Sequence, residues 1–163
     1  MPASALEIIK QHAGREGGLL PALHELQHTF GHIPTELVGP VAQAFNISRA
    51  EVHGVISFYP DFRTEPAGTH VLRICRAEAC QSMGAEELAA HAMKILGCGF
   101  HSTTPDARFT LEPVYCLGLC AQSPAITLDD QPYARVTPQQ LEALLGSAGL
   151  QPGGQVAKTE GQP

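Results

Sequence analysis

The chain has 163 residues, of which 44% are hydrophobic and 16% charged, so it suits one medium domain or two small ones and excludes wholesale disorder. Its formal net charge of −6 argues against nucleic acid or an anionic membrane as a partner, since both favour basic surfaces. The N-terminus shows no secretory pattern, and no uninterrupted apolar segment approaches the roughly 18–20 residues that a membrane span needs. We therefore expect a cytoplasmic protein with reduced thiols.

Residues 1–66 predict a helical N-terminal domain. Apolar residues recur at helical spacing over residues 3–13 and 19–30, and glycines follow each segment. Pro34 suits the first turn of a third helix, because its missing N–H has no partner to lose there. The apolar stripe of that helix would consist of Leu37, Val41, Ala44 and Phe45.

A fourth helix is predicted to begin after Ser48 and to end near Tyr59. Ser48 and Glu51 form the capping-box pattern, in which each side chain bonds the other residue's backbone N–H. The residues expected to be buried by this helix are Val52, Val55, Ile56 and Tyr59. The proline- and glycine-containing stretch 60–68 then reads as a linker.

The hydrophobic period changes after residue 68. Strands are predicted over residues 71–74, 108–114, 125–128 and 133–136, with a turn over 129–132, and helices over 84–96 and 137–148. This order indicates a small α/β sheet of thioredoxin-like type over residues 67–150, so that the whole chain is of the α+β or α/β class. The tail 151–163 is poor in apolar residues and is expected to be disordered.

Four of the five cysteines fall into two close pairs. Cys75 and Cys80 form a C-x4-C pair, and Cys116 and Cys120 form a C-x3-C pair, with residues 81–115 between them. In a reducing compartment such pairs indicate metal or redox chemistry before disulfides. We interpret the four as thiolate ligands of one metal centre. Cys75 would end the first strand, Cys80 would shortly precede a helix, and the second pair would lie between two strands, so that all four emerge at one edge.

Four clustered cysteines are typical of several kinds of site, of which a 2Fe–2S cluster is the one we favour. Structural zinc also takes four cysteines, usually in tighter C-x2-C pairs, and two disulfides would need an oxidising compartment. A thioredoxin-type dithiol lacks its C-x-x-C, and a Rieske centre would need two histidines within the pairs. For a 2Fe–2S cluster, Arg76 and nearby backbone N–H groups would stabilise the negative charge and Glu78 would oppose it. Gly84 and Gly118 would let the backbone approach the ligand.

Other candidate residues have simpler interpretations. His24, His28 and His32 recur every four residues and could bind a metal, but a solvated polar helix face explains them as well. Cys98 is interpreted as a small buried hydrophobe. No Ser-His-Asp set, P-loop or G-x-G-x-x-G pattern occurs, so we expect no substrate or nucleotide site on this chain.

Over about residues 18–146 the chain resembles the 24-kDa subunit family of respiratory complex I. The resemblance lies in residues 54–59 (GVISFY) with Phe62, in both cysteine pairs, and in Pro124 and residues 133–137 (YARVT). It implies a helical domain, a thioredoxin-like domain and one 2Fe–2S cluster. The ligands that it implies are Cys75, Cys80, Cys116 and Cys120. The aromatic residues Phe58, Tyr59 and Phe62 could contact a partner, although core packing is expected for at least two of them.

Residues 75–82 and 96–101 depart from the complex I pattern and look like the gamma subunit of soluble, NAD-dependent, molybdenum-containing formate dehydrogenases. That resemblance implies a non-catalytic electron-transfer subunit beside a partner that carries FMN, NAD and a 4Fe–4S cluster. A further large subunit would hold the molybdenum cofactor. Equivalent subunits of complex I or of a bidirectional NAD-linked hydrogenase are the alternatives of the same class, and a zinc-stapled adaptor is the alternative of another class.

Overall fold

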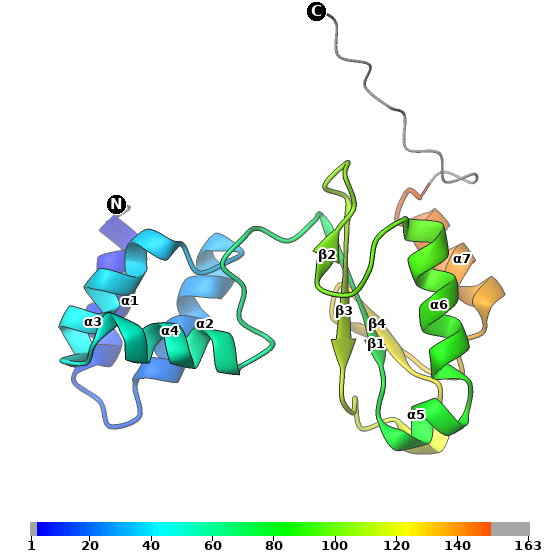
Figure 1. Ribbon diagram of the computed structural model, residues 1–163, viewed down its shortest axis with the longest axis horizontal. Coiled ribbons are helices and arrows are strands. Elements are labelled where there is room, and N and C mark those ends of the chain that lie inside the picture. Colours follow the sequence, from blue (N-terminus) through cyan, green and yellow to red (C-terminus); the bar gives the residue numbers. More distant parts are fainter. Residues whose placement is uncertain (1–2, 151–163) are drawn as a thin grey trace, which may run out of the picture. The chain divides into compact units, whose positions relative to one another are not determined.

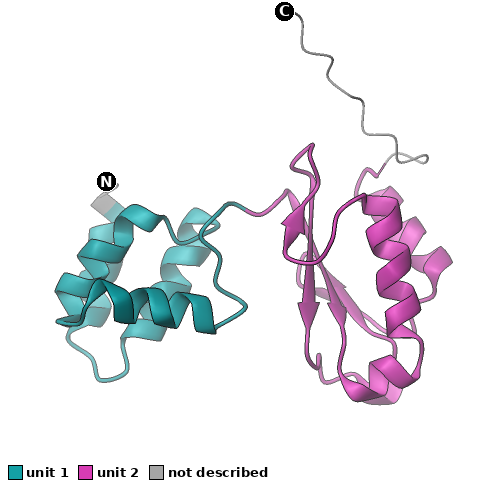
Figure 2. Ribbon diagram, viewed as in Figure 1, with its two compact units in different colours: residues 1–66 teal, residues 67–163 magenta. Residues whose placement is uncertain are grey.

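The computed structural model describes residues 3–150, which form parts of two compact units (Figure 2). We call residues 1–66 the helical unit and residues 67–163 the sheet unit. The tail predicted to be disordered, residues 151–163, lies outside the described residues. Among the described helices, none is both long and apolar enough to cross a membrane.

The helical unit contains four α-helices and one 3-10 turn. These are α1 (Ala3–Ala13), α2 (Leu19–Phe30), η1 (Thr35–Leu37), α3 (Val38–Phe45) and α4 (Arg49–Phe58). The first two helices were predicted with these bounds, and the left-handed Gly31 ends α2. The third helix does not begin at Pro34, because Pro34 is extended and the next three residues wind as a 3-10 turn. In α3 the buried alanine is Ala42, and Ala44 is exposed, contrary to the prediction.

Helix α4 begins with the predicted capping box. The Glu51 N–H donates to Ser48 Oγ at 3.1 Å, and the Ser48 N–H donates to Glu51 Oε2 at 2.7 Å. The helix ends at Phe58, so Tyr59 is extended (φ −90°, ψ 114°) and leaves the buried face. Val52 and Ile56 are buried and Val55 is partly buried, as expected, whereas the prediction that Tyr59 is buried is wrong.

The three aromatic residues around the end of α4 differ in exposure. Phe62 is 8% exposed and belongs to the apolar core, while Phe58 is 77% and Tyr59 is 39% exposed. The expectation that at least two of them pack in the core is therefore wrong, since only Phe62 does. The linker predicted over residues 60–68 thus contributes a core residue to the helical unit.

The sheet unit is a five-stranded mixed sheet in the order β2-β3-β1-β4-β5 (Figure 1). The strands are β1 (His70–Cys75), β2 (Ser102–Thr103), β3 (Phe109–Val114), β4 (Ile126–Leu128) and β5 (Gln131–Tyr133). Strands β1 and β3 are parallel, and the other pairs are antiparallel. The helices are α5 (Glu78–Ser82), α6 (Ala85–Leu96) and α7 (Pro138–Ser147), with a 3-10 turn η2 (Cys120–Gln122).

Helices α6 and α7 lie on the same face of this sheet (Figure 1). Alternation along the strands turns the large apolar residues toward these helices. The buried strand residues in this cluster are Leu72, Ile74, Phe109, Leu111, Ile126 and Leu128. Leu88 of α6 and Leu141 of α7 pack against them, and His91 Nε2 and Glu142 Oε1 join the two helices at 2.7 Å.

Three features of the sheet unit differ from the prediction. Helix α5 and strand β2 are extra, and both are too short to show an apolar period. The last strand covers residues 131–133 instead of 133–136. Its hairpin turn takes only Asp129 and Asp130, both with positive φ (51° and 66°), which is the geometry of a two-residue turn. Arg135 also has a positive φ, 52°, and lies beyond the strand.

Candidate metal centre

The parallel pairing of β1 and β3 brings the two cysteine pairs to one edge of the sheet. Cys75 is the last residue of β1 and lies opposite Val114, the last residue of β3. The Arg76 N–H donates to the Val114 carbonyl at 2.8 Å, and Cys116 follows two residues later. Because parallel strands end at the same edge, residues far apart in the sequence begin their loops side by side.

Cys75 and Cys80 form the buried half of the site. Each is 2% exposed, and both pack with Ala85 and Ala125, which are also buried. The Cys75 N–H donates to the carbonyl of Ala125, the residue before β4, at 3.0 Å, so this segment holds the end of β1 in place. Cys80 lies inside the short helix α5, whereas the prediction placed it in a loop before a helix.

Cys116 and Cys120 form the exposed half of the site. Their Sγ atoms are 3.6 Å apart, and the Gly118 N–H donates to Cys116 Sγ at 3.4 Å. Cys116 has φ 90°, which is uncommon for a residue other than glycine and costs free energy on the order of 1–3 kcal/mol. Such strained backbone is typical of ligand-binding segments.

Two of the thiols have shifted pKa values of opposite sign. Burial alone would raise the pKa of Cys75, but hydrogen bonds from the Ala77 backbone, the Cys80 thiol and the backbone of Cys116 and Leu117 lower it below its usual range. The pKa of Cys120 is raised, first by its hydrogen bond with Cys116 and then by the negative charge of Cys116 and the other site cysteines. Negative charge is thus more readily placed on Cys75, where backbone N–H groups converge, than on Cys120.

The spacing of the exposed cysteine pair fits two thiolates on one metal and does not fit a disulfide. Two sulfurs bound to one tetrahedral metal at about 2.3 Å lie roughly 3.8 Å apart, close to the 3.6 Å between Cys116 and Cys120. All five cysteines are free, and a disulfide would need about 2.05 Å. A 2Fe–2S cluster takes two thiolates at each iron.

Of the two charged residues expected to tune the site, Arg76 is compensated and Glu78 is exposed. Arg76 forms a bidentate salt bridge with Glu86, with nitrogen–oxygen distances of 2.9–3.1 Å, so its charge is neutralised. Its guanidinium also lies over the Phe100 ring. Glu78 is exposed in the first turn of α5. Positive φ values of 88° at Gly84 and 76° at Gly118 account for these two glycines without any appeal to a ligand.

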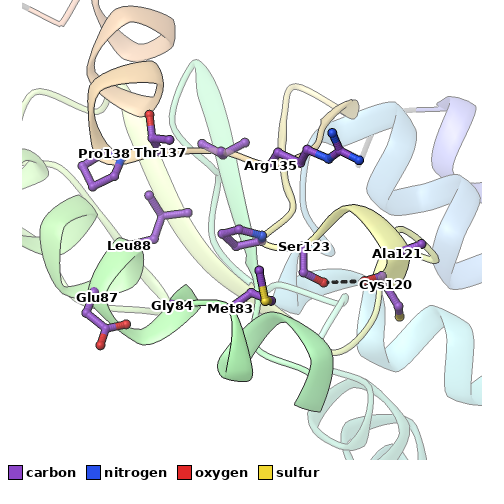
Figure 3. A pocket seen from close by; sticks show the side chains of 12 residues that line it. Met83, Gly84, Glu87, Leu88, Cys120, Ala121, Ser123, Arg135, Thr137 and Pro138 are labelled. Atoms are coloured by element: carbon purple, nitrogen blue, oxygen red, sulfur yellow. Dashed lines mark hydrogen bonds between the residues drawn. The ribbon is translucent and has the colours of Figure 1, made fainter.

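The structure adds one polar residue that the spacing did not reveal. Ser123, immediately after η2, is buried, and its hydroxyl donates to the Cys120 carbonyl and contacts Cys80 Sγ. It lies in the wall of an open cavity of about 760 Å³ whose lining includes Met83, Cys120 and Arg135 (Figure 3). The sequence does not indicate this role for Ser123, because its contact with Cys80 joins residues 43 positions apart.

The histidine candidates belong to the helical unit, and Cys98 belongs to the sheet unit. His24 and His28 are exposed, His24 packs against Phe62 with ring centroids 4.7 Å apart, and His32 Nδ1 contacts the Phe30 carbonyl. Within the described residues no group of three or more His, Cys, Asp and Glu side chains is arranged to hold a metal ion, these histidines included. Cys98 is only half-buried, less than predicted, and this burial raises the pKa of its thiol.

Comparison with known proteins identifies the fold and its relatives. The family model described as thioredoxin-like [2Fe-2S] ferredoxin matches residues 5–148. NADH-quinone oxidoreductase subunit 2 of Thermus thermophilus is 37% identical over 148 residues, which cover 90% of this chain and 81% of that one. NADP-reducing hydrogenase subunit HndA of Solidesulfovibrio fructosivorans is 32% identical, with coverage of 86% and 82%.

A solved structure of an NAD+-reducing [NiFe]-hydrogenase in the H2-reduced state shares the fold. The TM-score is 0.69 over 80% of this chain, with 24% sequence identity. The chain spans only 22% of that hydrogenase chain, so the likeness concerns the fold alone.

Proposed function

Since the chain belongs to the thioredoxin-like [2Fe-2S] ferredoxin family, we propose that it carries one 2Fe–2S cluster as an electron-transfer subunit. Its ligands would be Cys75, Cys80, Cys116 and Cys120. The observation that carries this proposal is the meeting of both cysteine pairs at the edge where the parallel strands β1 and β3 end. Such a cluster, when bound, accepts and releases one electron at a time.

The chain's own residues would position and insulate this centre. Cys75 and Cys80 hold their sulfurs among buried small residues, which keeps water from that side. Backbone N–H groups of Ala77, Cys116 and Leu117 direct positive partial charge at the Cys75 sulfur. Cys116 and Cys120 are exposed, so a partner could approach within a short distance of the site from their side.

The parent complex is the finer part of the proposal. The named relatives favour a subunit of an NADH-quinone oxidoreductase or of an NADP-reducing hydrogenase. The neighbouring subunit that binds FMN and NAD is the partner that the family resemblance implies. The formate dehydrogenase assignment, with a molybdenum-containing large subunit, rests on residues 75–82 and 96–101 alone, and the relatives support the other two complexes as well or better. The chain itself would oxidise no substrate.

The ligand assignment is tested on the full chain with Cys116→Ser, and Cys98→Ser serves as the matched control. The wild type and Cys98→Ser should bind two irons and show the visible and paramagnetic resonance spectra of a 2Fe–2S protein. Cys116→Ser should lose iron or change the spectrum. Full iron with an unchanged spectrum in Cys116→Ser would remove Cys116 from the ligand set, and zinc in place of iron in the wild type would favour the adaptor.

The parent complex is tested by purifying the tagged chain with its bound subunits. Molybdenum in the complex together with formate-dependent NAD reduction would identify a formate dehydrogenase. Nickel with hydrogen-dependent reduction would identify a hydrogenase, and quinone reduction by NADH would identify the quinone oxidoreductase. A chain that purifies without any flavin-containing partner would contradict its role as a subunit of such complexes.

A further inference from the structure

One buried hydroxyl connects the two cysteine-bearing segments. Ser123 is 7% exposed, and its Oγ lies 2.8 Å from the Cys120 carbonyl oxygen and 3.5 Å from Cys80 Sγ. The hydroxyl donates to the carbonyl and accepts from the Cys80 thiol. Ser123 therefore contacts one cysteine of each pair, and Figure 3 shows its side chain directed toward Cys120 from the cavity wall.

The hydrogen bonds that the Ser123 hydroxyl can make change when Cys80 becomes a metal ligand. A serine hydroxyl has one hydrogen and can accept two bonds. A metal-bound cysteine is a thiolate without a hydrogen, so the Cys80 sulfur can then only accept. The single Ser123 hydrogen has two acceptors within reach, and a bond to an ionised acceptor is roughly twice as strong as one to a neutral carbonyl. Cys120 is an exposed residue, whereas Cys80 is 2% exposed.

We propose that Ser123 is a positioning residue whose hydroxyl turns from the Cys120 carbonyl to the Cys80 sulfur in the iron-loaded protein and raises the reduction potential of the site. This inference rests on the proposed function. A hydrogen bond to a ligand sulfur stabilises the more negative, reduced state more than the oxidised one. Cys80 is 2% exposed, so little water competes for that sulfur.

The test compares two hydroxyl deletions in the full iron-loaded chain. Ser123→Ala removes the proposed donor. The control, Thr127→Val, removes a hydroxyl from β4. Thr127 is 7% exposed, like Ser123, and its hydroxyl has no hydrogen-bond partner in the described residues. At a fixed ambient potential near the wild-type midpoint, we expect the ratio of reduced to oxidised Ser123→Ala to be roughly three- to tenfold lower. A tenfold change corresponds to about 59 mV for a one-electron couple. Thr127→Val should keep the wild-type ratio.

Two outcomes overturn the proposal directly, and a further variant decides if Ser123→Ala does not load. An iron-loaded Ser123→Ala with the wild-type midpoint overturns it, as does an equal shift in Thr127→Val. If Ser123→Ala binds no iron, Ser123→Thr decides, because it keeps the hydroxyl and must bind iron at the wild-type midpoint. Loss of iron in both variants would show that the site depends on the shape of residue 123. Failure of the proposed function is separate, since it appears in the wild type, which would then hold no 2Fe–2S cluster.

Discussion

The helical unit and the sheet unit bury different kinds of side chains. The helical core is almost entirely aliphatic, and its one buried polar residue among those described is His12, paired with Glu25 at 2.6 Å. The sheet unit buries the polar residues Thr104, Thr110, Ser123 and Thr127. It also has a second, small cluster of Cys75, Cys80, Ala85 and Ala125 beneath the cysteine edge.

This difference indicates where each unit draws its stability. Large aliphatic side chains contribute about 1.5–3 kcal/mol each when fully buried, so the helical unit is stabilised by its own packing. The small cluster at the cysteine edge buries little apolar area, and strained Cys116 adds a cost. The sheet unit also has a large aliphatic core under α6 and α7, so this weakness is confined to the cysteine edge. We therefore expect the cysteine edge of the sheet unit to depend on the proposed metal and the helical unit to be independent of it.

Iron removal should give the largest effect and should separate the two units. In the full chain stripped of iron, we expect the sheet unit's unfolding temperature to fall by more than about 10 °C, because the sulfurs lose their common partner. Hydrogen exchange, read segment by segment, should rise in β1, α5 and residues 115–125 and stay unchanged in α2 and α4. Equal changes in both units would contradict the division of stability proposed above.

A core truncation in the helical unit should give the converse result. Leu26 is fully buried in α2, and Leu26→Ala should cost about 2–5 kcal/mol through lost burial and the cavity left behind. Hydrogen exchange should rise in α1–α4, whereas the iron content and visible spectrum of the sheet unit should stay at wild-type levels. The matched variant Leu111→Ala, equally buried in β3, should reverse this pattern. A loss of iron in Leu26→Ala would show that the units are coupled.

The sequence predicts the long helices well and the short elements poorly. The bounds of α1, α2, α6 and α7 followed within about one residue from apolar period, glycines and capping patterns, because those signals are local. The short α5 and β2 carry no such period. Strand β5 was misplaced because Asp129 and Asp130 adopt positive φ without a glycine to indicate it.

The cysteine site was predictable only in part for a related reason. Spacing identifies Cys75, Cys80, Cys116 and Cys120 as two pairs, and the period of the strands predicts that they share an edge. The role of Ser123 arises from a contact with Cys80 across 43 positions, which only the folded backbone establishes. The same holds for the exposure of Phe58, which depends on where α4 ends.

A smaller effect is expected from one hydroxyl within the sheet. Thr127 Oγ1 is buried in β4 and has no hydrogen-bond partner within residues 3–150. Thr127→Val keeps the side-chain shape and removes this unsatisfied group, so we expect the sheet unit to gain about 1 kcal/mol of stability. Denaturant unfolding of the iron-loaded chain measures the gain. A loss of stability would show that an ordered water satisfies the hydroxyl.

The smallest expected effect concerns the two capping boxes, one in each unit. The box of α4 has a carboxylate, Glu51, whereas the box of α7 has an amide, Gln140, bonded to the Thr137 N–H at 3.0 Å. Hydrogen bonds from the Ser48 backbone and side chain lower the pKa of Glu51. Its stabilisation is therefore complete above the unfolded-state pKa of about 4.3 and is lost as the pH falls through the lower folded-state pKa.

Glu51→Gln keeps the acceptor for Ser48 but removes this titration. The helical unit of Glu51→Gln should become more stable relative to that of the wild type as the pH is lowered from 7 to about 3, because only the wild type loses a charged acceptor. Hydrogen exchange of the first α4 amides measures the change. Gln140→Glu is the reciprocal variant and should give α7 the acid sensitivity that α4 loses, since the two boxes share one geometry. An identical acid response of wild type and Glu51→Gln would mean that other carboxylates, and not this cap, set the acid limit of the helical unit.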